Sequence, residues 1–421
     1  MRTLFRFAIL FACMSFAANI LAESNLSLSE AIDLATQNQP VLQSYDQASY
    51  SAREAAISSC QLPDPRLKLG IVNLPITGAD TGRFSRDDMT MSTIGVMQEM
   101  VPRAKREAAS RTMEAAADQY QTEKSATALS IQRDVALAWL DVYEAQRRTE
   151  LYQRILDEAT AERSVMTSRV SSGNTELSEV LKQDIEISML NDKRLTILRD
   201  ERKARAALAR WIGSAADRTF SQALPVMTHP MDATASSNSL ENHPLLRNAH
   251  EQEEVALSEV DAAKAGRELN WNWEVMYGKR RADLSDMVTF QIAMDIPWDR
   301  PKRQDRQTSQ KMLLVDKARS LTEDRRRELA AQLQNAMSDA EIAQARETEH
   351  QTRLIPTAQA RLDIAQAGYK AGKQNLSELW QARRGVLEVE MEHWSIMTDM
   401  ARASVNMDYL LNGQLFQGAQ R

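Results

Sequence analysis

Side chains that could do chemistry are sparse along this chain of 421 residues. The five histidines are scattered, and His243 and His250 form the only close pair. No cysteine or histidine cluster has the spacing of metal ligands, and neither a nucleophile motif nor a phosphate-binding loop is present. We therefore expect a protein that is not an enzyme and that uses no cofactor and no metal site.

Methionine is abundant, with 20 residues, and Met89, Met91 and Met97 share one face of a predicted strand. A thioether is a soft ligand, so such a face has the chemistry to handle a soft metal ion. Methionine more often fills irregular apolar surface without a chemical role. The spacing alone leaves both interpretations open.

The composition favours long helices over a compact mixed fold. Glycine and proline are rare, with 13 and 11 residues, and aromatic residues make up 5% of the chain against 26% charged residues. The formal net charge is -6, and basic runs such as Arg325 to Arg327 stand beside acidic residues. This pattern is typical of a solvated helix face and predicts no nucleic-acid partner.

The first 22 residues have the features of a cleaved signal peptide: early arginines, an apolar run from Phe7 to Leu21, and a small residue, Ala22, at the expected cut. Lipidation at Cys13 is the alternative, although that cut would fall inside the apolar run. Removal of the peptide leaves Cys60 as the remaining cysteine, so no disulfide framework is expected. Later residues contain no apolar run of about 18, the length that a spanning helix needs.

A motif at residue 171 returns about 200 residues later, which indicates two tandem structural repeats. Its two copies are SSGNTELSEVLKQ, residues 171–183, and KAGKQNLSELWQA, residues 370–382. Other landmarks recur in the same order: Asn38 to Leu42 with Asn242 to Leu246, Pro102 to Arg106 with Arg300 to Arg303, and Trp211 to Gly213 with Leu411 to Gly413. We expect a first repeat over 23–213, a linker over 214–239, a second repeat over 240–413 and a tail over 414–421.

Each repeat contains two segments in which polar and apolar residues alternate, the pattern of a β-hairpin. The expected strands cover about 66–74 and 89–100 in the first repeat, and about 270–278 and 286–296 in the second. Tilted strands of this length can cross an outer membrane. Two hairpins cannot close a barrel alone, because open edges in lipid leave backbone groups unpaired. Copies of the chain must then share strands; otherwise the hairpins are soluble caps on a helical bundle.

A proline follows each hairpin, Pro102 or Pro297, and ends the strand pairing. Basic residues come next and suit the level of lipid headgroups. They are Arg103, Lys105, Arg106, Lys302 and Arg303. A plain strand-to-helix junction with solvated charges accounts for the same pattern.

Long helices follow both junctions. Nothing breaks the helical pattern between 107 and 170, which as a helix is about 95 Å long. A 4,3 spacing that includes Ile131, Leu156 and Arg163 predicts a left-handed supercoil with neighbouring helices. The second long helix covers about 304–370, with a kink expected at Pro356.

Each long helix ends in a glycine-containing turn, near 171–175 in the first repeat and near 370–374 in the second. Glycine at a helix end takes the left-handed backbone conformation that other residues resist. We therefore expect two helical hairpins, with a second helix returning to about Ile212 or Leu411.

With these features the chain resembles the TolC-like outer-membrane efflux proteins over nearly everything after the signal peptide. The resemblance is carried by the duplication, by the hairpin followed by proline and basic residues, by Leu354-Ile355-Pro356, and by Tyr369 to Gly372 followed by Leu376 to Leu379. It implies a mainly α fold with a small membrane β-barrel portion. Three copies would form one twelve-stranded barrel, continued by a periplasmic α-helical barrel.

The resemblance also implies roles for residues near the helical tips. An acidic residue six positions after the second tip glycine often faces the narrow periplasmic entrance in that family, which points to Glu378. Glu179 holds the matching place in the first repeat, and Gln381 stands where some relatives carry a second acid. Rings of such glutamates would disfavour anions. Alternatively, both are exposed charges favoured by the helix dipole.

Two further sets of residues follow from the same resemblance. The tips are expected to dock with a periplasmic adaptor, through Ser172, Gly173, Asn174, Thr175, Ala371, Gly372, Lys373 and Gln374. The polar strand faces are expected to line the barrel lumen, through Arg66, Lys68, Asn272, Glu274, Gln291 and Asp295.

We therefore predict the outer-membrane channel of a tripartite efflux system, a passive homotrimeric conduit for small molecules or metal ions, embedded in outer-membrane lipid. Energy would come from an inner-membrane pump of the RND type. Val96 to Arg103 look like the strand-to-helix junction of relatives that serve heavy-metal pumps. Two alternatives stay open: a soluble periplasmic coiled-coil scaffold or adaptor, and an outer-membrane channel for type I protein secretion.

Overall fold

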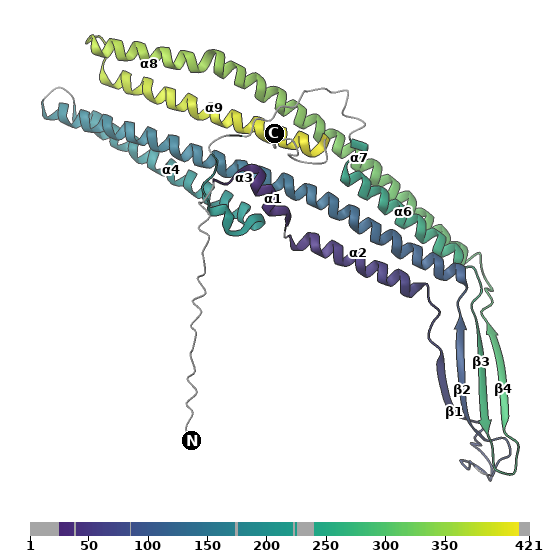
Figure 1. The fold of residues 1–421 in the computed structure, drawn as a ribbon. Coiled ribbons are helices and arrows are strands. Elements are labelled where there is room, and N and C mark those ends of the chain that lie inside the picture. The colour runs from purple at the N-terminus through teal and green to yellow at the C-terminus, as the bar shows by residue number, and fades with distance from the viewer. Residues whose placement is uncertain are drawn as a thin grey trace, which may run out of the picture.

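The protein is a long rod with a small sheet at one end (Figure 1), and 73% of its described residues are helical. The computed structural model describes residues 25–37, 39–84, 86–172, 176–221, 224 and 240–411. The expected signal peptide and tail, most of the expected linker, and tip residues 173–175 lie outside the described residues. The long helices run away from the sheet, and their far ends lie at the opposite end of the rod (Figure 1).

Both halves of the chain contain a helix, two strands and a pair of long helices in that order. The first half contains α1 (Leu28–Gln37), α2 (Pro40–Ser59), β1 (Arg66–Val72), β2 (Met91–Met100), α3 (Arg103–Ser171) and α4 (Leu177–Ile212). The second contains α6 (Pro244–Ala265), β3 (Trp271–Lys279), β4 (Met287–Met294), α7 (Gln304–Glu349), a π-helical turn (His350–Leu354), α8 (Ile355–Lys370) and α9 (Leu376–Leu411), and a short 3-10 helix (Gly213–Asp217) lies between the halves. The strands occupy the segments in which alternation predicts them.

Helix α3 has 69 residues and begins immediately after Pro102. It contains neither glycine nor proline, so no residue interrupts its backbone hydrogen bonds. The start lies four residues before the expected one at 107, which puts Arg103, Lys105 and Arg106 in the first turn of the helix. These basic residues therefore belong to the helix itself.

Pro356 does not stop the second long helix. It occupies the first turn of α8, and the π-helical turn His350–Leu354 directly precedes that helix. A proline ring clashes with the carbonyl one turn earlier, and a π-helical turn adds one residue to that turn. The helix passes the proline by widening at this turn.

The main hydrophobic core lies midway along the rod, around the middle of α3. Trp139 is fully buried there and stacks on Tyr143, with ring centroids 5.5 Å apart. Helix α3 is the central element, because it packs against α1, α2, α4, α6 and α9. A separate small cluster near the second tip contains Ala365, Leu376, Leu379, Trp380 and Ala382.

Near the tips the buried face of α3 differs from the predicted seam. The buried residues are Leu151, Ile155, Ala159, Glu162 and Met166. The predicted seam shares Ala159 and Met166 with this face, but it also included Leu156, which is half-buried, and Arg163, which is exposed. The seam prediction followed apolar spacing alone, whereas the face that is buried depends on where the partner helices α4 and α9 lie.

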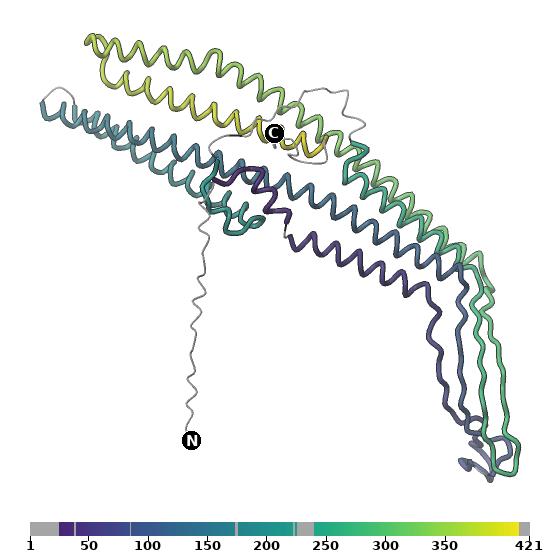
Figure 2. The backbone as a smooth tube through the Cα atoms, viewed as in Figure 1, coloured from purple at the N-terminus to yellow at the C-terminus, as the bar shows by residue number. Residues whose placement is uncertain are grey.

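The four strands form one antiparallel sheet in the order β1-β2-β3-β4. The pairing of β2 with β3 joins the two halves of the chain, with Met97 opposite Glu274 and Ser92 opposite Lys279. Figure 2 shows the strands lying side by side and the long helices running away from them. The two predicted hairpins are therefore one continuous sheet.

Candidate functional site

The sheet has a polar face built from alternate residues of all four strands. Residues directly opposite each other in an antiparallel ladder project to the same side. One row contains Arg66, Met97, Glu274 and Gln291, and the next begins with Lys68. Asn272, two residues before Glu274, projects to the same side. We call this side the polar face; it holds five of the six predicted lumen residues, and Asp295 lies one residue beyond β4.

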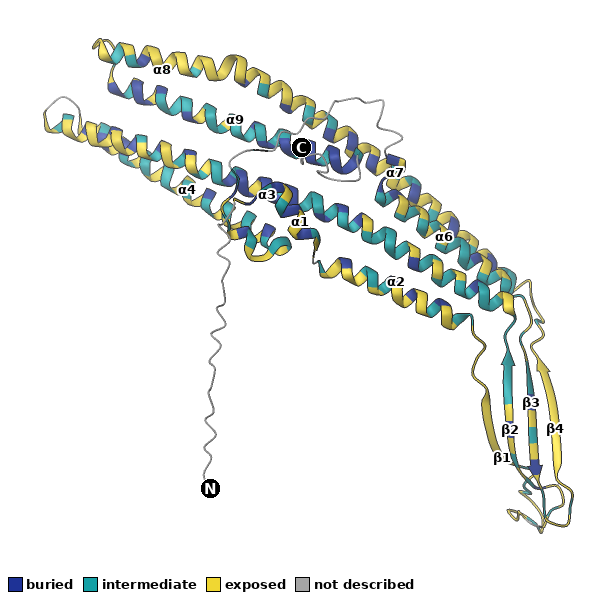
Figure 3. Cartoon of the chain, viewed as in Figure 1, coloured by how far each residue is buried: buried dark blue, intermediate teal, exposed yellow. Residues whose placement is uncertain are grey.

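The opposite side, the apolar face, carries exposed hydrophobic side chains. Its exposed members include Leu67, Leu69, Ile71, Ile94, Val96, Trp271, Val275, Tyr277, Val288, Phe290, Ile292 and Met294. Leu69 and Val288 are each 71% exposed. Figure 3 shows the outer strands as exposed almost throughout. A contiguous apolar surface of this kind marks contact with lipid or with another protein.

Lys68 and Glu274 form an ion pair within the polar face. The Lys68 Nζ lies 2.5 Å from a Glu274 carboxylate oxygen, although β2 separates their strands. Gly95 lies opposite Lys68 on β2 and has no side chain to block the path. The Glu274 side chain is only 10% exposed, so the lysine neutralises a largely buried charge.

The sheet has two free edges. In the described part of the chain, β1 and β4 are the terminal strands, and each pairs on one side only. An edge strand presents unpaired backbone donors and acceptors that can bind a further strand. The sheet can therefore accept a further strand at both edges.

Hydrogen bonds fix the junction between the sheet and the helices. Lys105 donates from Nζ to Asn270 Oδ1 at 2.8 Å, and Arg106 donates to the Cys60 carbonyl. Arg103 forms an ion pair with Glu107 at 2.6 Å. Lys105 therefore ties the start of α3 to the residue before β3, and Arg106 ties it to the end of α2, whereas the Arg103 pair lies within α3.

The second helical tip is a tight turn that glycine makes possible. Gly372 has a φ of +68°, the left-handed region that side chains disfavour. The backbone N–H groups of Lys373 and Gln374 both donate to the Gly368 carbonyl, at 2.9 and 3.2 Å. Asn375 then caps α9, because its Oδ1 accepts from the Glu378 N–H at 2.8 Å. Of the first tip, only Ser172 of the predicted contact residues is described, at the end of α3.

The two candidate entrance glutamates have different surroundings. Glu378 is exposed in the first turn of α9, as is Gln381 one turn later. Glu179 lies half-buried in the first turn of α4 and forms an ion pair with Lys182 at 2.7 Å. The hydrogen bond to Glu179 raises the pKa of Lys182. The Glu179 charge is thus balanced locally.

A buried ionic cluster near the tips joins the two helical hairpins, and sequence reasoning missed it. Glu162 of α3 is 1% exposed and accepts a hydrogen bond from Gln183 Nε2 at 3.2 Å. Arg384 of α9 lies 3.9 Å from the Glu162 carboxylate and pairs directly with Glu186 of α4. Burial raises the pKa of Glu162, while the Arg384 charge and the Gln183 hydrogen bond oppose that shift.

Two partly exposed ion pairs lie beside this cluster along the same interface. Arg154 and Glu390 are 3.1 Å apart, and Glu158 and Arg383 are 3.2 Å apart. Each pair links α3 of the first hairpin to α9 of the second. Contact between the hairpins near the tips is therefore largely ionic, in contrast to the apolar core midway along the rod.

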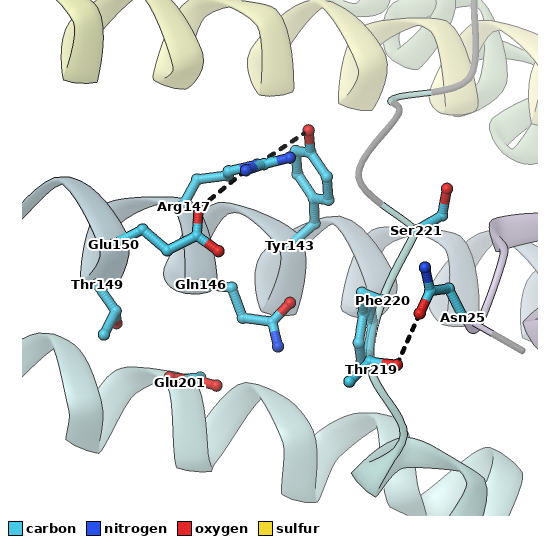
Figure 4. A pocket seen from close by; sticks show the side chains of 10 residues that line it. All are labelled: Asn25, Tyr143, Gln146, Arg147, Thr149, Glu150, Glu201, Thr219, Phe220 and Ser221. Carbon is cyan, nitrogen blue, oxygen red and sulfur yellow. Dashed lines mark hydrogen bonds and ion pairs between the residues drawn. The ribbon is translucent and has the colours of Figure 1, made fainter. Parts of the chain in front are cut away.

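A cavity of about 380 Å³ lies beside the middle of α3. Figure 4 shows Arg147 directed toward Tyr143 and Glu150, and Thr219 bonded to Asn25 on the other side of the cavity. Nearby, Leu26 and Phe220 form an isolated parallel bridge that ties the start of the described chain to the segment after α4. The lining contains no catalytic arrangement, so we assign the cavity no function.

The histidine pair does not form a site. His243 is 1% exposed and caps α6 by accepting from the Leu245 N–H at 3.2 Å. Burial lowers the pKa of this imidazole, which favours the neutral form. No cluster of three or more metal-ligating side chains occurs in the described ranges. Among those residues, no helix has both the length and the apolar character needed to cross a bilayer.

Solved structures with this fold are outer-membrane channels and a related membrane protein. The fold matches a membrane protein from Pseudomonas aeruginosa at a TM-score of 0.76 and 15% identity, covering 91% of this chain and 92% of that one. The Campylobacter jejuni CmeC outer membrane channel gives 0.76 and 13%, covering 92% and 85%. The open state of the Neisseria gonorrhoeae MtrE outer membrane channel gives 0.71 and 17%, covering 91% and 88%.

Residues 235–413 match the model of the outer membrane efflux protein family. No curated protein sequence matches the chain significantly. The family model therefore matches the second half of the chain, and the solved structures share the fold of nearly the whole described chain.

Proposed function

We propose that three copies of this chain form one channel that spans the outer membrane and continues into the periplasm. One observation carries the proposal: a sheet with an exposed apolar face and two free edges ends a rod of long helices. Backbone groups at a free edge cannot stay unpaired in lipid, where each costs several kcal/mol. Pairing β1 of one copy with β4 of the next would remove every edge.

Closure would give twelve strands, because three copies each contribute four. The apolar face would meet lipid, and the polar face would line the lumen, with Asp295 near its end. The long helices would assemble into the periplasmic tunnel. A duplicated structural unit is supported by the shared order of elements in two segments, 23–213 and 240–413, which lie on either side of a linker at 214–239.

At the far end, the helical tips would dock with a periplasmic adaptor that couples the channel to an inner-membrane pump of the RND type. The contact residues proposed are Ser172, Gly173, Asn174, Thr175, Ala371, Gly372, Lys373 and Gln374. Glu378 and Gln381, with Glu179 in the other hairpin, would surround the periplasmic entrance. The exposed position of Glu378 supports this role more strongly than the ion-paired position of Glu179.

The exposed apolar face argues against the soluble scaffold, because a soluble protein rarely leaves so large an apolar surface in water. A channel for type I protein secretion would have the same barrel and helical tunnel. The fold therefore does not distinguish such a channel from an exporter of small molecules or metal ions.

Cysteine cross-linking of the sheet edges tests closure. In a Cys60→Ser background, Leu69→Cys on β1 is combined with Val288→Cys on β4, and neighbouring positions on the apolar face sample the other registers. These pairs cannot meet within one chain, since β2 and β3 separate their strands. Oxidised outer membranes should yield covalent species of two and three chains and none larger. Monomers throughout, or a protein found only in the soluble periplasm, would refute the proposal.

A further inference from the structure

Methionines gather on the polar face of the sheet, where the neighbouring side chains are mostly hydrophilic. The strands contain Met91, Met97, Met100, Met276, Met287 and Met294. Strand register puts four of these six on the polar face: Met91, Met97, Met276 and Met287. Met89, which alternation placed with Met91 and Met97, precedes β2.

Two glycines bring these thioethers over the sheet backbone. A Cβ added at Gly278 would lie 2.5 Å from Met91 Sδ, so this sulfur covers β3, and Met287 lies directly opposite Gly278 on β4. A Cβ added at Gly95 would lie 3.1 Å from Met276 Cγ, and Met97 follows two residues later on the same face. The four methionines therefore form two pairs, each beside a glycine.

The four side chains follow one another along the strands. Met97 lies in the row of Glu274, Met276 in the next row, Met287 in the row after that, and Met91 beyond it. Successive rows are about 6.8 Å apart. Nothing in the sequence reveals this order, because β2 and β3 belong to different halves of the chain.

We propose that this methionine ladder is a series of weak sites for a soft monovalent cation, Cu(I) or Ag(I). The assignment rests on the proposed function, since it requires the polar face to line a lumen. Thioethers are neutral, soft ligands that prefer such ions over Na⁺ or K⁺. A conduit works with several weak sites, because an ion held tightly at one place does not leave.

The charged groups of the same face do not supply this selectivity. Lys68 and Glu274 neutralise each other, and Arg66 and Glu99 lie in the rows next to the helices. Toward the other end of the strands, the rows of Met287 and Met91 contain no charged side chain in the paired strand residues. Recognition there would depend on sulfur. The competing explanation is that these methionines only fill the space above Gly95 and Gly278.

Silver binding to the purified full-length protein separates the two explanations. Leucine conserves the volume of methionine but has no sulfur, so the test protein carries Met91→Leu, Met97→Leu, Met276→Leu and Met287→Leu in a Cys60→Ser background. The control carries Met100→Leu and Met294→Leu, which alter the apolar face. Equilibrium dialysis against silver nitrate should show affinity about tenfold or more weaker for the test protein. The control should match the parent.

Equal silver binding by the test protein and the parent would overturn the proposal and leave gap filling as the explanation. If the fourfold variant does not fold, the double variants Met91→Leu with Met287→Leu and Met97→Leu with Met276→Leu each replace one pair. Potassium currents in planar bilayers keep this inference apart from the proposed function. Absence of current contradicts the channel, whereas a current that micromolar silver leaves unchanged contradicts the ladder alone.

Discussion

Lys68 on β1 and Glu274 on β3 are bonded across an intervening strand, so one ion pair ties together the two halves of the chain. Gly95 on β2 lies opposite Lys68, and a Cβ at that glycine would lie 2.8 Å from the Val275 carbonyl oxygen. The close approach of β2 to β3 and the path of the lysine both depend on this glycine. The ion pair and the glycine therefore fix the register in which the halves meet.

Loss of the lysine should destabilise the sheet. Lys68→Ala leaves a largely buried carboxylate without its partner, which costs about 1–3 kcal/mol. Arg66→Ala, on the same strand and face, is the control and should change stability by about 0.5 kcal/mol or less. Heat-induced unfolding of the purified protein measures both. A similar loss in the two variants would show that the Lys68–Glu274 pair has no special role.

Arg384 should matter more than its neighbour Arg383. Arg384→Ala removes the cation nearest the buried Glu162 and should cost about 1–3 kcal/mol. Arg383→Ala breaks a partly exposed pair with Glu158 and should cost about 0–1 kcal/mol. Denaturant unfolding of the two variants checks this order. Equal losses of stability in the two variants would mean that burial of Glu162 does not increase the contribution of Arg384 to stability.

Glu162 should also make stability depend on pH. Its pKa is raised above the ordinary value of 4.5 mainly by burial, so the folded state favours the protonated acid. That contribution is complete below the unfolded pKa and is lost as pH rises through the folded pKa. A glutamine at this position does not titrate, so Glu162→Gln does not lose this stability as pH rises. The melting temperature of the variant minus that of the parent should therefore increase as pH rises from the unfolded pKa of Glu162 through its folded pKa. A constant difference at all pH values would contradict the assignment.

The entrance glutamates should not contribute equally to ion selectivity. Glu378→Gln removes an exposed charge and should lower the cation preference of the channel by about twofold or more, since like charges in a confined ring act strongly on permeant ions. Glu179→Gln should change it less, because Lys182 already balances that charge. Reversal potentials in planar bilayers measure both variants and the double variant. Unchanged values for all three would leave the glutamates as solvating charges.

Alanine substitution at two glycines near the second tip should change stability in opposite directions. Gly372→Ala forces a side chain into the left-handed region and should cost about 1–2 kcal/mol. Gly385→Ala, inside α9 with only Arg361 Nη1 at 4.0 Å from the added Cβ, should stabilise the helix by about 0.5–1 kcal/mol. Hydrogen exchange at the Lys373 and Gln374 amides reports on the tip. If Gly372→Ala does not accelerate exchange at these two amides, this account of the turn is contradicted.

Alternation was enough to locate the strands, because one side of each strand is polar and the other apolar. It did not predict that β2 pairs with β3, since that contact depends on how the two halves pack and not on either strand alone. The Lys68–Glu274 pair and the methionine ladder follow from this pairing. Neither could be predicted before the register of β2 against β3 was known.

The helices were predicted in length but not in detail. Absence of glycine and proline accounts for the continuity of α3, yet the spacing of apolar residues put Arg163 in the seam where Glu162 is buried. A buried glutamate is stable there because Gln183 and Arg384 come from other helices, which no local pattern reveals. Pro356 predicted where the second long helix departs from regular α-helical geometry. The form of that departure, a π-helical turn at His350–Leu354, was visible only in the structure.

Native mass spectrometry of the protein extracted from outer membranes tests the central claim most directly. Edge pairing of β1 with β4 predicts a closed particle of three chains, stable in detergent without added partners. A mass three times that of one mature chain is the predicted result. A single-chain mass from outer membranes, or recovery of the protein only as a soluble periplasmic monomer, would contradict the account.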